Sequence, residues 1–119
     1  DCQRWNMLHP EEEPKLCYVQ KCLNDREGPI IAATDYVKAY ANQLSTYLPC
    51  RRFVALGTDG FGRSDTRANL RRHFEVNRHY IALAALKALA DDGMVEPKLA
   101  ADALKRFGID VNKPNPLFA

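Results

Sequence analysis

The residues of this sequence whose types and spacing could support chemistry are concentrated between Gly57 and His73, in the stretch GTDGFGRSDTRANLRRH. Three glycines within six residues precede a helix pattern rich in arginine. Glycines can expose backbone N–H groups, and together with Arg63 and the start of a helix they could attract an anion. Asp59 and Asp65 could act as an acid–base pair, and Ser64 could act as a nucleophile with His73 as its base.

The anion-binding interpretation competes with a structural one. The spacing of Gly57, Gly60 and Gly62 matches neither the dinucleotide fingerprint G-x-G-x-x-G nor a phosphate-binding P-loop, which needs a lysine. Glycines also supply positive φ angles in a tight turn, and Ser64 or Asp65 can occupy the donors of the helix start. Two aspartates disfavour a phosphate in direct contact. We favour a structural loop and keep an anion site as the alternative.

A catalytic role for the same stretch has little support in the sequence. No spacing places Asp59, Asp65, Ser64 and His73 within hydrogen-bond reach of one another, and there is no G-x-S-x-G nucleophile elbow. Turn formation and helix capping explain these acids and alcohols together. We therefore expect no catalytic residue in this chain.

The basic side chains of the stretch could also suggest a nucleic-acid helix. The chain as a whole has 17 basic and 15 acidic residues, and outside Gly57 to His73 the two signs are equal at 13 each. No aromatic stacking pattern or zinc-ligand spacing accompanies the arginines. We therefore expect no nucleic-acid partner, and instead a helix face that is solvated or pairs with a neighbouring domain.

Cysteine and histidine usage predicts neither disulfides nor a metal site. The four cysteines are sparse and include no C-x-x-C pair, and the three histidines are scattered. Free thiols fit a reducing compartment. No apolar run approaches the roughly 18 residues of a membrane span, and the first residues do not resemble a signal peptide. The expectation is a soluble, cytoplasmic protein without a membrane partner.

The elements that would position the loop form a βαβ unit. Residues 29–34 (PIIAAT) and Phe53 to Gly57 are short apolar runs without alternation, typical of strands covered on both faces. Between them, Asp35 can cap a helix with an apolar stripe that ends before Pro49. The stripe comprises Val37, Tyr40, Ala41, Leu44 and Leu48. Two parallel strands joined by a right-handed crossover follow from this order.

The remaining segments predict further helices. Three glutamates and Pro14 in a first turn, before Leu16, Val19 and Leu23, indicate a helix that ends at the turn residues 24–28. Three more are expected from the capping residues 64–66 to about Phe74, from residue 77 or 78 to Asp91, and from Pro97 to Gly108. Residues 1–10 show no assignable period, and residues 109–119 read as an irregular tail.

Two strands are too few for a sheet that some five helices cover, since open sheets commonly have about four to six strands. We expect a single α/β domain over residues 1–119, with a three-layer α/β/α arrangement that is incomplete at its N-terminal side. The further strands, and any catalytic domains, would then lie upstream of Asp1.

Several segments together resemble one family. They are RWNMLHP (4–10), ATDY (33–36), LGTDGFGRSDTRANLRRHFEV (56–76), and FGID (107–110) followed by Asn115-Pro116. In order along essentially the whole chain, they are similar to the C-terminal end of the homodimeric bacterial pyruvate dehydrogenases. One departure is visible, because this chain has Leu16-Cys17-Tyr18 where the family tends to have proline before the tyrosine.

The resemblance implies a parent enzyme that decarboxylates pyruvate on thiamine diphosphate with Mg²⁺ and passes the acetyl unit to a lipoyl group on the acyltransferase component. The parent would be a homodimer of three-domain chains, and this segment would be most of its transketolase-type C-terminal domain. The segment itself would bind no cofactor and would supply interface and active-site-approach structure. The residues expected to face that approach, or an anion, are Asp59, Gly60, Phe61, Gly62, Arg63, Ser64 and Asp65.

Two alternatives to this interpretation remain at the level of sequence. One is a freestanding regulatory or interaction domain that binds an anion at the glycine-containing stretch. The other is the C-terminal domain of a transketolase.

Overall fold

A pair of parallel strands lies at the centre of the structure, a computed structural model that describes all 119 residues. Strand β1 (Ile30–Ala33) pairs with β2 (Phe53–Leu56), with Ile30 opposite Phe53 and Ala33 opposite Leu56. Both strands are short apolar runs whose residues are half-buried, except for Ala33 at the end of β1, which is exposed. This confirms the predicted parallel βαβ core.

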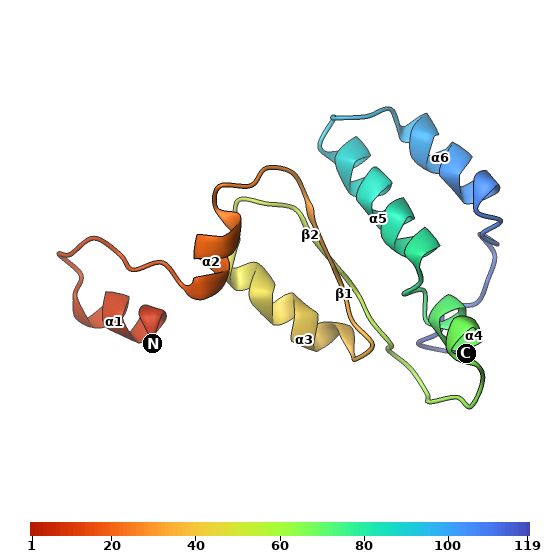
Figure 1. The fold of residues 1–119 in the computed structure, drawn as a ribbon, viewed down its shortest axis with the longest axis horizontal. Coiled ribbons are helices and arrows are strands. Elements are labelled where there is room, and N and C mark those ends of the chain that lie inside the picture. The colour runs from red at the N-terminus through yellow and green to blue at the C-terminus, as the bar shows by residue number, and fades with distance from the viewer.

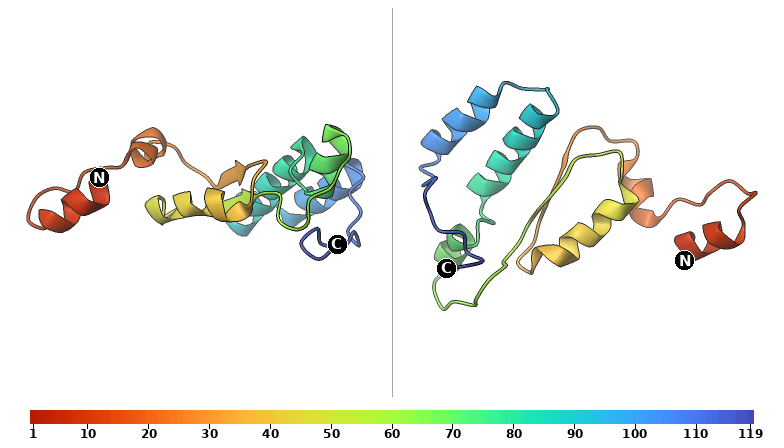
Figure 2. Two further views of the ribbon diagram at one scale, coloured as in Figure 1. Left: turned by 90° about the horizontal axis from the view of Figure 1, so that it is seen from below. Right: turned by 180° about the vertical axis from the view of Figure 1, so that it is seen from behind.

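Helices cover both faces of the sheet (Figures 1 and 2). Helix α3 (Lys38–Asn42), continued by the 3-10 turn η1 (Gln43–Tyr47), packs on one face. Helix α5 (Arg78–Asp91) packs on the other, and α6 (Pro97–Arg106) lies against the outer side of α5. The predicted α/β fold with helices on both sides of the sheet is therefore confirmed.

The three C-terminal helices begin where capping chemistry predicts. The Thr66 hydroxyl accepts a hydrogen bond from the amide of Asn69 and opens α4 (Arg67–His73). The Asn77 side chain accepts from the amides of His79 and Tyr80 at the start of α5. Pro97 occupies the first turn of α6, where its missing N–H costs no helix hydrogen bond.

The N-terminal prediction was wrong in two respects. Residues 1–10 contain a helix, α1 (Cys2–Leu8), although they show no clear apolar period. The next helix, α2, spans only Tyr18–Leu23, so the glutamates and Pro14 precede it instead of forming its first turn. The reason is local, because the backbone of Lys15 is bonded to the Asn6 side chain and Cys17 is extended at φ −68° and ψ 160°.

The start of α3 also differs from the prediction. Its N-cap residue is Val37, and Asp35 makes no capping bond. The first helical amide, that of Lys38, donates instead to the carboxylate of Asp59, which comes from the loop after β2. Of the predicted apolar stripe, Leu48 is buried, whereas Val37, Tyr40 and Leu44 are exposed.

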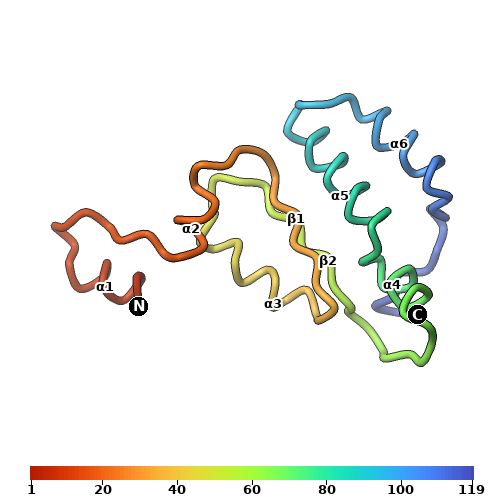
Figure 3. The backbone as a smooth tube through the Cα atoms, in the orientation of Figure 1, coloured from red at the N-terminus to blue at the C-terminus, as the bar shows by residue number.

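The chain has more exposed surface than a compact protein of its size. Its radius of gyration is 17.4 Å, against about 13.5 Å expected for a compact chain of this length. Its accessible surface is 8875 Å², against about 6,500 Å² expected for its mass. Part of the excess comes from α1 and α2, which extend away from the sheet (Figure 3). None of the helices is both long enough and apolar enough to cross a bilayer.

Candidate functional site

The site is built from two loops that leave the carboxyl ends of the two strands. The loop after β1 and the loop after β2 (residues 57–66, here the glycine loop) are joined by hydrogen bonds. The Thr58 amide donates to the carbonyl of Tyr36 at 2.8 Å, and the Thr58 hydroxyl donates to the carbonyl of Asp35 at 3.1 Å. The two loops therefore form one unit at the sheet edge where α/β proteins commonly bind ligands.

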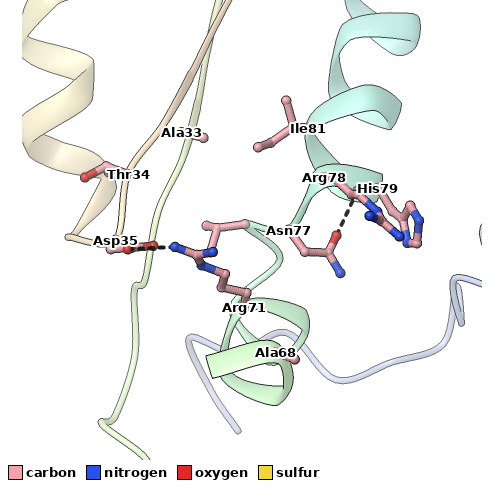
Figure 4. A pocket seen from close by; sticks show the side chains of 10 residues that line it. Ala33, Thr34, Asp35, Ala68, Arg71, Asn77, Arg78, His79 and Ile81 are labelled. Carbon is pink, nitrogen blue, oxygen red and sulfur yellow. Dashed lines mark hydrogen bonds and ion pairs between the residues drawn. The ribbon is translucent and has the colours of Figure 1, made fainter. Parts of the chain in front are cut away.

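A cleft opens between these loops and the starts of α4 and α5. It has two adjoining hollows of about 640 and 510 Å³, which share Asp35, Arg71 and Val76 among their lining residues. Arg71 reaches across from α4 and its guanidinium lies 3.4 Å from the Asp35 carboxylate (Figure 4). This ion pair ties α4 to the loop after β1 at the centre of the cleft.

Two of the predicted site residues have structural roles. The Asp59 carboxylate accepts the Lys38 amide at 2.8 Å. Gly60 has φ +110°, and a Cβ atom there would lie 2.3 Å from the Pro116 carbonyl oxygen. A side chain at this position would meet both a strained backbone and another segment of backbone. The Gly60 position therefore requires glycine because the C-terminal tail passes directly over it.

The carboxylate of Asp65 also accepts hydrogen bonds from neighbouring residues. Its carboxylate accepts the side-chain amide of Asn69 at 2.8 Å and the backbone amide of Thr66 at 2.6 Å. These two hydrogen bonds, the Asn69 bond first, lower the pKa of Asp65 below its usual value of 3.8. Asp59 and Asp65 thus bind different elements, α3 and α4, and the structure does not bring them together as an acid–base pair.

The remaining predicted residues are freer. Phe61 is 79% exposed. Gly62 has open space around it and an ordinary φ angle. Arg63 makes no ion pair within 4.0 Å, and it lines both the 510 Å³ hollow and a neighbouring one of about 450 Å³. Ser64 is exposed and makes no hydrogen bond to another residue. The glycine loop therefore has anchored positions, Asp59, Gly60 and Asp65, and an accessible tip formed by residues 61–64.

His73 is the last residue of α4 and lines the 450 Å³ hollow together with Arg63. Its Nε2 atom is buried without a hydrogen-bond partner. Burial, followed by the positive charges of Arg63 and Lys113, lowers the pKa of His73 below its usual value of 6.5. The structure gives no hydrogen bond between His73 and Ser64, so the nucleophile–base pair is not assembled.

Three features of the site were missed in the sequence. The first is the Asp35–Arg71 ion pair, because Asp35 was assigned to a helix cap. The second is the position of the C-terminal tail, where Lys113 donates to the His73 carbonyl at 2.8 Å and to the Glu75 carboxylate at 3.0 Å. The third is Glu75 itself, which has φ +62°. A Lys-Pro-Asn-Pro tail offers no periodicity that would have placed it.

The donors in this chain do not fit thiamine diphosphate and its divalent ion. No three His, Cys, Asp or Glu side chains are grouped so that they could share a metal ion. The two aspartates of the glycine loop already accept hydrogen bonds from different elements. We therefore derive no catalytic step through the cofactor from this chain.

Comparison with known proteins identifies the family. Residues 3–77 match the family described as the transketolase-like TK C-terminal domain. A pyruvate dehydrogenase E1 component from Pseudomonas aeruginosa is 56% identical over 115 residues, which is 97% of this chain and 13% of the relative. The corresponding proteins of Cupriavidus necator and Escherichia coli K12 are 54% and 51% identical, over 98% and 100% of this chain and again 13% of each relative.

The extent of these matches has two consequences. The chain spans about an eighth of the length of the curated relatives that it matches. The matches nevertheless cover nearly all of the chain, including both strands, the glycine loop and, in Escherichia coli, the tail. The chain therefore belongs to the transketolase-like TK C-terminal domain family and is the counterpart of that domain in pyruvate dehydrogenase E1 components.

Proposed function

We propose that this chain works as the C-terminal domain of a pyruvate dehydrogenase, where it provides interface and active-site-approach structure but no catalytic group. The observation that carries the proposal is the 51 to 56% identity to pyruvate dehydrogenase E1 components along nearly the whole chain. The relatives named above are all such components, which favours this function over a transketolase or a freestanding anion-binding domain.

The proposal includes further structure upstream of Asp1. The two-stranded sheet has helices on both faces, and the apolar side chains of Val37, Tyr40 and Leu44, at the start of α3, within it and in η1, are exposed. The accessible surface is also larger than a compact chain needs. Additional strands beside β1 or β2 and the catalytic domains of the same protein would cover this surface, and residues 1–119 would then be part of one domain.

The whole protein would decarboxylate pyruvate in the cytoplasm, on thiamine diphosphate and Mg²⁺ bound by its other domains, as a homodimer. It would pass the acetyl unit to a lipoyl group of the acyltransferase component. The glycine loop would lie beside this approach, with Phe61, Arg63 and Ser64 facing it, because these side chains are accessible and unpaired. Asp59, Gly60 and Asp65 would hold the loop in shape.

The experiment compares the isolated chain with the full-length protein by titration calorimetry against thiamine diphosphate and Mg²⁺. We expect binding and pyruvate decarboxylation only in the full-length protein. Micromolar binding of the cofactor by the isolated chain would overturn the non-catalytic assignment. A full-length protein that transfers two-carbon units between sugars, and does not consume pyruvate, would support the transketolase alternative instead.

A further inference from the structure

The N-terminal segment before α2 folds back on itself through one side chain. The Asn6 amide group of α1 donates to the carbonyl of Lys15 at 3.0 Å and accepts the amide of Lys15 at 2.8 Å. The Trp5 ring contributes to the same contact. Its centroid lies 4.3 Å from that of the stacked His9 ring and 4.0 Å from the ammonium nitrogen of Lys15. The segment before α2 is therefore fixed beside α1 at Lys15.

The spacing on the two sides of this contact brings two cysteines together. Cys2 precedes Asn6 by four residues, so the two side chains share one face of α1 and are about 6 Å apart along its axis. Cys17 follows Lys15 by two residues, and its own backbone is extended at φ −68° and ψ 160°. Asn6 contacts Lys15 and Cys2 contacts Leu16, so the helix and the segment run in opposite directions. Cys2 on the helix therefore lies near Cys17 on the segment.

The side-chain contacts agree with this construction. The Cys2 thiol lies 3.5 Å from the carbonyl oxygen of Leu16, the residue next to Cys17. The Cys17 backbone is held by its amide, which donates to the Gln20 side chain at 2.8 Å. Both thiols are half-buried, whereas those of Cys22 and Cys50 are exposed. All four cysteines are free thiols in this structure.

We propose that Cys2 and Cys17 form an oxidisable dithiol, which low-molecular-weight disulfides convert into a disulfide that ties α1 to the segment before α2. The resulting bridge would close the loop that contains the acidic residues 11–13.

The reaction balances as two thiol–disulfide exchanges. One cysteine loses its proton and its thiolate attacks a sulfur atom of the small disulfide, which gives a mixed disulfide and releases one small thiolate. The second cysteine loses its proton and attacks the protein sulfur of the mixed disulfide. This step forms the Cys2–Cys17 bond and releases a second small thiolate. The two protons end on the released thiols, so the protein loses two electrons and the small disulfide gains them.

The surroundings of the pair set its pH dependence. Burial, followed by the neighbouring Cys2 side chain, raises the pKa of Cys17 above its usual value of 9.0. Because the thiolate is the attacking species, an attack by Cys17 accelerates as the pH rises toward the pKa of Cys17.

The test is incubation of the full-length protein in buffers with varied ratios of reduced to oxidised glutathione, followed by peptide mapping by mass spectrometry. We expect one internal disulfide between Cys2 and Cys17, with the loss of two hydrogen atoms, and glutathione adducts on Cys22 and Cys50. Separate glutathione adducts on Cys2 and Cys17 at every ratio, without an internal disulfide, would overturn the proposal.

Variants separate the pair from general thiol reactivity. Cys17→Ser should abolish the internal disulfide, whereas Cys22→Ser and Cys50→Ser should leave its yield unchanged. Asn6→Ala keeps both cysteines but removes the contact that aligns them, so ring closure from the mixed disulfide should slow by about tenfold or more. Closure of Asn6→Ala at the unmodified rate would contradict the alignment by Asn6.

Discussion

The carboxylate of Asp59 accepts a hydrogen bond from the backbone amide of Lys38 at 2.8 Å, so a residue of the loop after β2 caps the helix that precedes β2. This bond closes the βαβ unit at its carboxyl end. It also gives this acidic residue of the glycine loop a structural role, because Oδ1 of Asp59 accepts a hydrogen bond inside the fold.

Replacement of this cap tests its structural role. Asp59→Ala should destabilise the start of α3 by about 1 kcal/mol, because the Lys38 amide loses its acceptor. Hydrogen exchange of the peptide that spans α3 would measure the loss of protection. Asp59→Asn keeps an acceptor oxygen and should retain most of the protection. Equal losses in the two variants would show that charge, not capping, is what Asp59 provides.

A pair of glycine substitutions tests the contact with the tail. Gly60→Ala should cost about 2 kcal/mol or more, because φ is +110° and the new Cβ would lie 2.3 Å from the Pro116 carbonyl oxygen. Gly62→Ala is the matched control, since nothing lies within 4 Å of its Cβ and its φ is ordinary. Thermal unfolding of both variants gives the comparison, and similar melting temperatures would argue against the tail crossing Gly60.

Lys113 is the second anchor of the tail. Lys113→Met should lower stability by about 1 kcal/mol, because the His73 carbonyl and the Glu75 carboxylate both lose a charged donor. Lys105→Met on α6 changes a lysine without an ion pair and should be nearly neutral. A double-mutant cycle with Glu75→Gln isolates the ion pair, and a coupling energy near zero would contradict it.

The pH dependence of stability should include a contribution from His73. Its pKa in the folded chain lies below 6.5, because burial and the charges of Arg63 and Lys113 disfavour the imidazolium. As the pH falls below 6.5, the unfolded chain takes up the proton first. The stabilisation from neutral His73 is therefore present above pH 6.5 and is lost as the pH falls through the folded pKa. Titration of the ring protons by NMR measures this pKa, and a value above 6.5 would be incompatible with the buried, unpaired Nε2.

The sequence predicted the elements whose signal is local. The strands at Ile30–Ala33 and Phe53–Leu56 follow from unbroken apolar runs. The helix α5 follows from the high helix propensity of its alanine-rich sequence, and α6 follows from the apolar face after Pro97. The helix α1 was missed because its contacts, such as Trp5 with His9, do not produce an apolar stripe.

The parts that the sequence did not predict depend on residues far apart in the chain. Asp35 is a plausible helix cap by its position alone, and only the folded chain shows that Asp59 takes this role while Asp35 pairs with Arg71. The difference between anchored and accessible positions in the glycine loop also depends on a residue far away in the chain. Gly60 differs from Gly62 because Pro116, more than fifty residues later, lies over one of them and not over the other.

The most direct test of the account is the effect of Arg63→Ala on two rates of the full-length protein. One rate is pyruvate decarboxylation with an artificial electron acceptor, and the other is acetyl transfer to a lipoyl domain. Arg106→Ala, on the outer helix α6, is the control. The proposed position of Arg63 beside the approach predicts that its removal lowers the lipoyl-dependent rate by about tenfold and leaves the other rate within about twofold. Equal losses of more than about a hundredfold in both rates, as expected for a catalytic group, would contradict the account.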